Sequence, residues 1–93
     1  MHVGVCSVDL LLPENHSLKG KRRVLRRIKD RVRNTFNVSI AEVSSLDSWQ
    51  HSTLGIACVS GDRPQVERQL SRVVDFIDGL HVAVIADIHT EIL

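Results

Sequence analysis

The spacing of apolar residues is the feature that most constrains the fold, because it switches between two periods along only 93 residues. Apolar and polar residues alternate in four segments, a pattern typical of half-buried β-strands. In two further segments apolar residues recur every third or fourth position, which predicts amphipathic helices. The predicted strands cover residues 2–12, 38–43, 54–60 and 82–93, and the predicted helices run from 18 to about 36 and from 63 to 78.

This order, strand–helix–strand–strand–helix–strand, predicts a ferredoxin-like α+β fold. In that fold a four-stranded antiparallel sheet carries both helices on one face. A parallel α/β sheet fits less well, because the second and third strands are joined too tightly for a crossover helix. Apolar residues make up 43% of the chain and charged residues a quarter, which excludes a disordered polyelectrolyte. We therefore expect a single ferredoxin-like domain over residues 1–93.

Local signals mark the ends of the helices and the faces of the last strand. Ser17 precedes the first helical residue and is the expected N-cap, although Gly20 stands where a capping box would have Glu. Gly79 is the expected C′ residue of the second helix. On the last strand, the residues expected to face the core are Val84, Ala86, Ile88 and Ile92.

The basic residues are concentrated on the first predicted helix. Nine of the twelve fall between positions 19 and 33, where Asp30 is the only acid. A solvated helix that merely uses good helix formers would interleave acids, whereas pairs such as Arg22 and Arg26 repel one another at this spacing. A polyanion such as the phosphate backbone of RNA would relieve that repulsion. The expected phosphate-binding residues are Lys19, Lys21, Arg22, Arg23, Arg26, Arg27 and Arg33.

Lys21 differs from the other basic residues because it falls within the apolar stripe, about one turn into the helix. In one interpretation its aliphatic stem covers the edge of the sheet while its ammonium reaches water. In the other, the ammonium helps to hold an anion at the N-terminus of the helix, where free backbone N–H groups already favour negative charge. The sequence leaves both interpretations open.

A second group of polar residues is expected at one end of the fold. There the loops after the first strand, between the second and third strands and after the second helix come together, which also brings His81 to this end. The candidate recognition pole consists of His16, Asp47, Trp49, Gln50 and His51. Stacking of Trp49 or a histidine on a base is one interpretation. Acid–base chemistry by His16 or His51 with Asp47, and loop residues that only bond the backbone, are the others.

No catalytic or cofactor motif accompanies these residues. The histidines lack an H-x-x-H spacing or a cysteine partner, so no metal site is expected. No activated nucleophile or glycine-rich phosphate loop is present, so we expect a non-enzymatic protein without a cofactor. Cys6 and Cys58 fall on inward faces of predicted strands and are expected to be buried, inert thiols.

The face of the predicted sheet that points away from the helices is small and apolar and carries no aromatic stacking platform. Its central positions are Val3, Val5, Ser7, Gly55, Ala57 and Val59. Such a face favours burial against a second copy of the chain, so a homodimer through this face is expected. No apolar run approaches the length of a membrane span, and the chain opens directly into strand-like sequence. A cytoplasmic location and no membrane partner are therefore expected.

Several blocks of sequence resemble the YlxP-like family of small, uncharacterised bacterial proteins. They are M-H-V-G-V at the start, H-S-L-K-G-K-R-R from His16, N-V-S-I-A-E-V from Asn37, D-S-W-Q from Asp47 and the closing E-I-L. They follow in order over nearly the whole chain. The resemblance implies a ferredoxin-like fold and no established activity. The genes of this family often accompany those for translation initiation and ribosome maturation, which implies a role near RNA.

Together, the charge pattern and the resemblance predict an accessory protein that associates with RNA or the ribosome through its basic first helix. One alternative is a dimeric interaction module whose basic helix docks on an acidic protein. Another is a small-molecule or anion-binding enzyme at the recognition pole. An acyl-phosphate hydrolase has this size and topology, but the first loop here reads Pro13-Glu14-Asn15-His16 in place of the glycine-rich loop that its chemistry needs.

Overall fold

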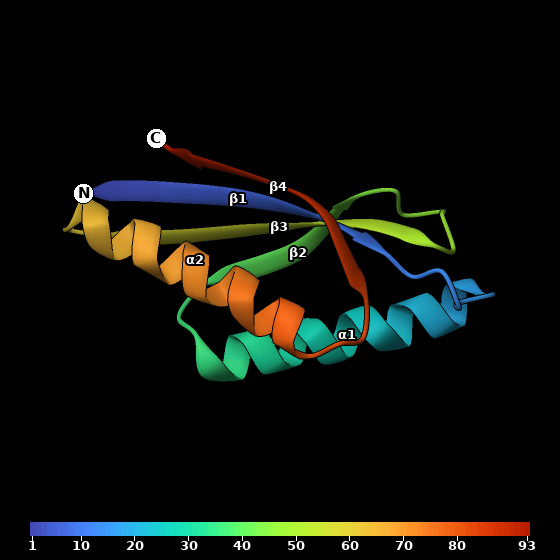
Figure 1. Cartoon of the computed structure of the whole chain (residues 1–93). Coiled ribbons are helices and arrows are strands. Elements are labelled where there is room, and N and C mark those ends of the chain that lie inside the picture. Colours follow the sequence, from blue (N-terminus) through green and yellow to red (C-terminus); the bar gives the residue numbers. More distant parts are fainter.

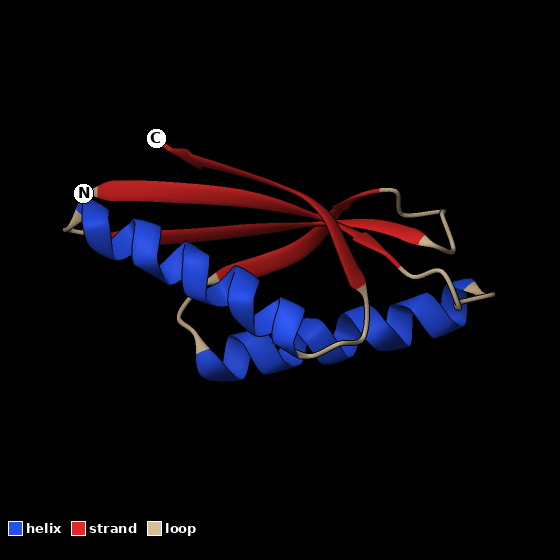
Figure 2. Ribbon diagram, in the orientation of Figure 1, coloured by secondary structure: helices blue, strands red, loops and turns tan.

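A computed structural model describes all 93 residues and confirms the predicted order of elements. Two helices lie together on one side of an open sheet (Figures 1 and 2). The elements are β1 (His2–Leu11), α1 (Leu18–Thr35), β2 (Ser39–Ser44), β3 (His51–Ser60), α2 (Arg63–Gly79) and β4 (Val84–Ile92). Neither helix has the length and apolar character of a membrane span.

The sheet is antiparallel throughout, with the strand order β2-β3-β1-β4. β1 lies in the middle and pairs with β3 along its whole length, from His2 opposite Ser60 to Leu11 opposite His51. β2 and β4 are the two edge strands. This arrangement is the ferredoxin-like α+β fold that the order of periodicities predicts.

The core lies between the sheet and the two helices, and the predicted apolar stripes form it. Leu25, Ile28 and Val32 of α1 are buried against the inward residues of the sheet. From α2 the buried residues are Val66, Leu70, Val73 and Ile77. The helices also meet through Phe36 and Phe76, whose rings pack edge to face with centroids 5.3 Å apart. Burial of such side chains stabilises the fold by about 1.5–3 kcal/mol each.

The start of α1 is set by contacts between Ser17, Gly20 and Asn15. Ser17 is the N-cap, as predicted, and its hydroxyl accepts a hydrogen bond from the Gly20 amide at 2.9 Å. A Cβ on residue 20 would lie 2.3 Å from the side-chain oxygen of Asn15. The missing capping-box Glu therefore has a steric reason, because only glycine leaves room for Asn15 at this point.

The end of α2 differs from the prediction. Gly79 is the last helical residue and does not have a positive φ. The left-handed residue is instead His81, with φ 53°. A histidine tolerates this conformation better than a β-branched residue, and here it turns the chain toward β4.

The faces of β4 were predicted wrongly at its start. A β-bulge interrupts the pairing of β1 with β4, so that Ile85 lies opposite Leu10 while Ile88 lies opposite Val8. The extra residue shifts the alternation, so that Ile85 points toward the core and Val84, which is 55% exposed, points away from it. Ala86 is exposed as well. The prediction was right for Ile88 and Ile92, which follow the bulge.

The third strand begins three residues earlier than predicted. Residues 51–53 pair with Leu11, Leu10 and Asp9 of β1, so His51 belongs to a strand and not to a loop. Ser52 is fully buried and donates a hydrogen bond to Glu42 of β2 at 2.7 Å. The sequence did not predict this extension, because residues 51–53 are polar and the strand was predicted from the alternation of apolar residues.

Candidate nucleic-acid interface

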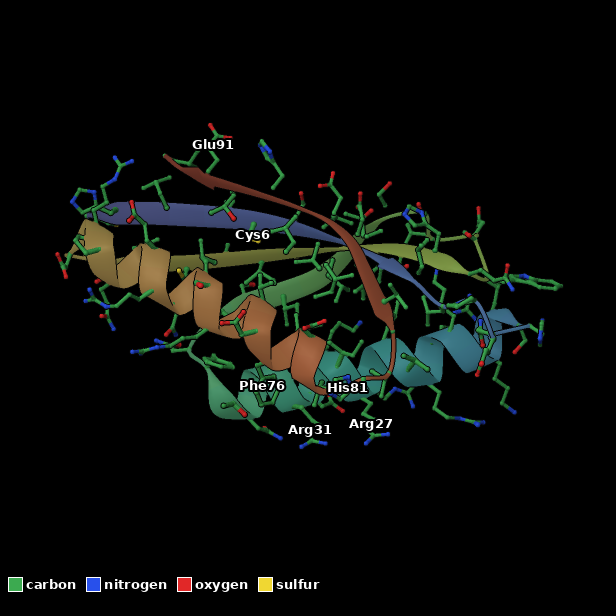
Figure 3. The ribbon with its side chains drawn as sticks, in the orientation of Figure 1. Cys6, Arg27, Arg31, Phe76, His81 and Glu91 are labelled. Atoms are coloured by element: carbon green, nitrogen blue, oxygen red, sulfur yellow. The ribbon has the colours of Figure 1, made fainter.

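The exposed side of α1 carries most of the positive charge of the protein. In Figure 3, Arg27 and Arg31 project from this helix away from the sheet. Seven basic residues of this helix have no carboxylate oxygen within 4.0 Å, because the four ion pairs of the chain involve other bases. We call these seven the basic face: Lys19, Arg22, Arg23, Arg26, Arg27, Lys29 and Arg31.

A shallow groove runs between the basic face and the edge strand β2. Arg22, Arg26 and Lys29 line it together with Arg33. Its acidic lining residues are Asp30, which lies 3.9 Å from Arg33, and Glu42. The Glu42 carboxylate is already bound to Lys21 at 2.9 Å and to Ser52 at 2.7 Å. The groove therefore keeps a strong excess of positive charge.

Arg33 has a structural role that the sequence did not reveal. One of its guanidinium nitrogens donates a hydrogen bond to the carbonyl oxygen of Ile40 at 2.8 Å. Ile40 belongs to the edge strand β2, so the arginine satisfies a carbonyl there. The side chain is still half exposed. No pattern in the sequence links residue 33 to residue 40, because the contact depends on how α1 is placed beside β2.

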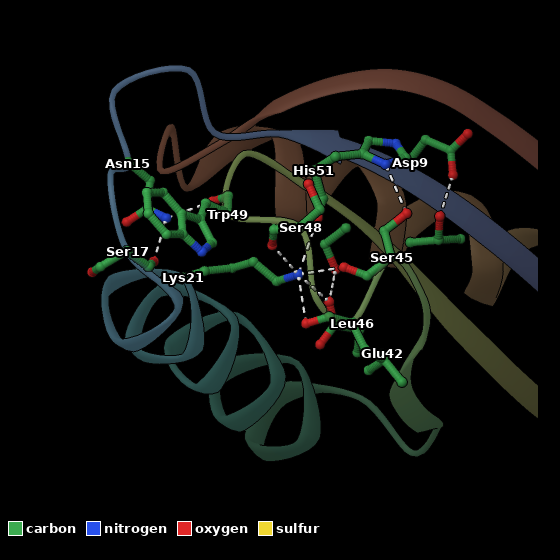
Figure 4. A network of polar contacts seen from close by, with 12 residues as sticks. Asp9, Asn15, Ser17, Lys21, Glu42, Ser45, Leu46, Ser48, Trp49 and His51 are labelled. Carbon is green, nitrogen blue, oxygen red and sulfur yellow. Dashed lines mark hydrogen bonds and ion pairs between the residues drawn. The ribbon is translucent and has the colours of Figure 1, made fainter.

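Lys21 is buried and does not reach a phosphate, which corrects its assignment as a nucleic-acid-binding residue. Only 1% of its surface is exposed. Its ammonium donates hydrogen bonds to the carbonyl oxygens of Ser45 and Ser48, both at 2.7 Å, and of His51 at 3.1 Å (Figure 4). A weaker contact of 3.5 Å reaches the carbonyl of Leu46. With Glu42 as counter-ion, the ammonium is fully occupied in holding the β2–β3 loop.

The physical reason lies in the position of Lys21 on the apolar stripe. A charge is stable in the core only when it is paired and hydrogen-bonded. The turning β2–β3 loop supplies those partners, since its carbonyls point inward toward the helix. The prediction that the ammonium reaches either water or a bound anion was therefore wrong in both forms.

The loops at the recognition pole are fastened to one another. Gln50 donates hydrogen bonds to the carbonyls of Pro13 and Asn15, each at 3.0 Å. Asn15 in turn donates to the carbonyls of Ser17 and Trp49. The β1–α1 loop and the β2–β3 loop thus form one unit at the N-terminus of α1 (Figure 4). Gln50 is here a structural residue.

The other members of the pole differ in how they are held. Trp49 is 54% exposed although its backbone is fixed by Asn15, so its indole is presented to solvent. His16 and Asp47 are exposed. His51 is half buried, and its Nδ1 lies 2.8 Å from the Ser45 hydroxyl. The loops meet as the topology predicts, but His51 is half buried in β3, and the amide of exposed Gln50 is bound to the β1–α1 loop.

His81 lies near the β1–α1 loop, as expected from the topology. It lines a cavity of about 520 Å³ together with Glu14, Asn15 and the start of β4. No three His, Cys, Asp or Glu side chains lie close enough together to hold a metal ion. Cys6 and Cys58 are buried, as predicted, and burial raises the pKa of the Cys58 thiol.

The outer face of the sheet, which points away from the helices, is open at its centre. Val59 is 61% exposed, and a hollow is lined in part by Val5, Gly55 and Ala57. Val43 leans over Gly55, where a Cβ would lie 2.8 Å from its side chain. The face has the smooth apolar character that the alternation of β1 and β3 predicts. Its use as a dimer interface stays a prediction.

Comparison with known proteins agrees with the fold. The designed protein Foldit4 aligns over 100% of this chain and 97% of its own length with a TM-score of 0.54, at 18% identity. A REP-associated tyrosine transposase bound to a REP hairpin aligns with 98% of this chain and 55% of its own length, with a TM-score of 0.47 and 15% identity. At these identities the first likeness concerns the fold alone, and the second carries no argument.

Sequence comparison identifies the family. The uncharacterised protein YlxP of Bacillus subtilis (strain 168) is 47% identical over 76 residues, which are 82% of this chain and 83% of the relative. Residues 3–90 match the model of a protein family described as a protein of unknown function, DUF503. The resemblance that the sequence blocks indicate is thereby confirmed. The chain belongs to the DUF503 family of YlxP-like proteins.

Proposed function

We propose that this protein is an RNA- or ribosome-associated accessory protein that binds phosphate backbone through the basic face of α1. The observation that carries the proposal is the lack of carboxylate partners for seven exposed or half-exposed basic side chains on one helix. If the charge served only solubility, acidic residues placed four positions from the basic ones would stabilise the helix. Such a role would place the protein in the cytoplasm.

The spacing along the groove suits an extended polyanion. Arg22, Arg26, Lys29 and Arg33 follow one another at intervals of three or four residues. With a rise of about 1.5 Å per residue, this row is about 16 Å long. Guanidinium groups bind phosphate in a bidentate way, and three of these four residues are arginines. A backbone with several successive phosphates therefore fits better than a single small anion.

Trp49 supports a partner with unpaired bases. Its exposed indole stands beside the N-terminus of α1, next to Asn15 (Figure 4). Aromatic side chains stack on unpaired bases, with about 1–3 kcal/mol per base, and they do so with little dependence on sequence. Exposed His16 lies in the same loop unit. We infer that the protein binds a single-stranded or looped segment whose phosphates follow the basic face.

The test is binding of a fluorescent single-stranded RNA oligonucleotide, followed by anisotropy over a range of salt concentrations. If five phosphates are neutralised, the logarithm of affinity should fall with the logarithm of salt concentration with a slope of about −3.5. A flat response would overturn the proposal. Trp49→Ala should weaken binding at every salt concentration without changing this slope.

A matched pair of variants separates a specific surface from net charge. The double variant Arg23→Glu/Arg26→Glu changes α1, and Arg68→Glu/Arg72→Glu makes the same change of charge on α2. The first should lower RNA affinity by at least about tenfold, while the second should leave most of it. Equal losses in both variants would indicate attraction by net charge alone. Thermal unfolding of both should remain close to that of the wild type, because all four arginines are exposed.

An acidic protein surface is the other partner that a basic face would attract. Affinity capture from a lysate, with and without nuclease treatment, distinguishes the two. Loss of the captured partners after nuclease treatment supports RNA. A partner that stays bound after complete digestion, and is lost with Arg23→Glu/Arg26→Glu, would replace RNA by a protein.

A further inference from the structure

The outer face of the sheet collects the exposed apolar side chains of the strands. Neither helix exposes a large apolar residue, whereas this face exposes four, which are Leu11, Val43, Val59 and Val84. No other element of the chain covers it (Figure 2). When one face of an antiparallel sheet is in water, its outward residues are usually polar. The outer face therefore has the character of an interface and not of a solvated surface.

The charges on the outer face restrict the kind of partner that fits it. Its acidic residues are Asp9, Asp87 and Glu91, which repel phosphate. It carries no aromatic side chain on which a base could stack, because Trp49 belongs to the β2–β3 loop and the two phenylalanines pack against each other between the helices. An apolar protein surface suits this face better than RNA does, and a second copy of the chain supplies one.

The two central strands give the face a regular frame with a protrusion and a hollow. β1 and β3 pair without irregularity from end to end, whereas both edge strands, β2 and β4, contain a bulge. Ala57 lines a hollow of about 360 Å³ on this face, together with Gly55 and Ser7, and these small residues leave its floor low. Two residues beyond Ala57 on β3, the side chain of Val59 is 61% exposed. The protrusion and the hollow thus lie on opposite sides of Ala57.

We propose that two copies of the chain pack sheet against sheet through their outer faces, around a two-fold axis that crosses the strands at Ala57 and Val5. The central strands of the two copies then run in opposite directions, so Val59 of each copy lies over Gly55 of the other. Outward residues follow one another at about 6.7 Å along a strand, so the usual crossing angle of about 30° moves Val59 sideways by only about 3 Å. This is less than the spacing of about 4.8 Å between strands.

The acidic residues select this orientation. Asp9 and Asp87 lie directly opposite each other on β1 and β4, and Asp9 is four residues, or about 13 Å, from the axis. In the proposed dimer Asp9 faces the start of β1 of the second copy, so both carboxylates stay at the rim, in water. If the strands of the two copies ran in the same direction, the two Asp9–Asp87 rows would face each other. Four carboxylates would then be desolvated without a partner.

The area that this arrangement covers is at the lower limit for a specific dimer. Nine residues of β1 and all four strands overlap, which corresponds to about 30 Å along the strands and about 19 Å across them. Each copy therefore buries about 550 Å² and the dimer about 1,100 Å², against a minimum of about 1,000 Å² for a specific interface. We expect reversible association. Because the helices lie on the other side of the sheet, both basic faces stay exposed, and RNA binding does not depend on the dimer.

The first measurement is the mass of the full-length protein by sedimentation velocity over a range of concentrations. Val59→Asp puts a carboxylate into the hollow of the second copy and should weaken the dimer by at least tenfold. Val84→Asp is the matched control, an exposed valine of the same face that lies opposite Leu11 and outside the overlap. It should change the affinity by less than about threefold. Thermal unfolding at a concentration where the protein is monomeric shows that both variants are folded.

A second variant keeps the test independent of an added charge. Ser7→Leu fills the position over which Val3 of the second copy lies, and it should weaken the dimer by steric conflict. Non-specific apolar association would instead become stronger with an added leucine. A stronger association of Ser7→Leu would therefore contradict the proposed fit.

Two neutralising variants test the orientation. Glu91 lies opposite Val5, in the row of the axis, so the Glu91 side chains of the two copies approach each other at the edge of the sheet. Glu91→Gln should strengthen the dimer several-fold, and Asp87→Asn should leave its affinity nearly unchanged. A larger gain from Asp87→Asn would overturn the orientation. A wild-type protein that stays monomeric at the highest concentration, or a dimer that is unaffected by Val59→Asp, would overturn the interface itself.

Discussion

The two helices pack on the same face of the sheet, but most basic residues of α1 are unpaired, whereas two of the three on α2 form ion pairs. α1 carries nine basic residues and one acid, and seven of the bases have no carboxylate partner. α2 carries Arg63, Arg68 and Arg72 with three acids, and it pairs Arg63 with Glu67 at 3.3 Å and Arg68 with the preceding Asp62 at 3.8 Å. The same chain therefore balances charge on one helix and leaves it unbalanced on the other.

The helices also differ in how they are attached. α2 approaches β1 closely at Gly4, where a Cβ would lie 2.3 Å from a methyl carbon of Val66. α1 is held near its N-terminus by the buried ammonium of Lys21. Only this one of its nine bases is part of the core. The comparison teaches that α1 is held through Lys21 and Arg33, whereas the seven residues of its basic face have no carboxylate partner within the fold.

The largest effect is expected from Lys21→Met. It leaves the Glu42 carboxylate without its counter-ion and several loop carbonyls without a donor. Removal of one partner of a buried ion pair typically lowers the free energy of unfolding by about 3–5 kcal/mol. Urea denaturation measures the loss. Lys19→Met is the matched control, two residues away on the exposed side, and should change stability by no more than about 0.5 kcal/mol. Similar results for both variants would contradict the structural role of Lys21.

A smaller loss is expected from Gly4→Ala, which tests the attachment of α2. The added methyl group would collide with Val66 and Leu70, and overpacking of this kind costs about 1–3 kcal/mol. Gly79→Ala is the control within α2, because nothing lies within 4 Å of that position and its φ is negative. It should leave stability unchanged or raise it by up to about 1 kcal/mol. If Gly79→Ala also lowered stability, the loss in Gly4→Ala could not be attributed to the close contact of residue 4 with α2.

The smallest changes in stability are expected from single charge reversals, which should stabilise the protein on α1 and destabilise it on α2. Arg22→Glu creates an i,i+4 pair with Arg26 near the positive end of α1 and should raise stability by about 0.2–0.5 kcal/mol. Glu67→Arg removes the pair with Arg63 on α2 and should lower it by a similar amount. Thermal unfolding at low salt measures both. Arg22→Glu should at the same time weaken RNA binding, so a loss of stability in this variant would mean that α1 needs its charge to fold.

Much of this molecule was predictable from local pattern. The spacing of Val8 and Leu10, or of Ile28 and Val32, determines strand or helix, because burial of one face requires that period. The excess of basic residues on α1 was visible for the same reason, since the helix period sorts them to the exposed side. The β-bulge near Ala86 was not visible, because a single extra residue changes the face without changing the composition.

The sequence by itself determined the order of elements, the two apolar stripes and the position of the charged helix. Each of these depends on neighbours along the chain. Only the tertiary structure decided which charged side chains are exposed to solvent and which are paired inside the fold. Lys21 and Lys19 belong to the same helix, yet one meets the carbonyls of a loop more than 20 residues away and the other meets water. An electric charge responds to whatever surrounds it in space, and the surroundings of a side chain are settled when distant segments pack together.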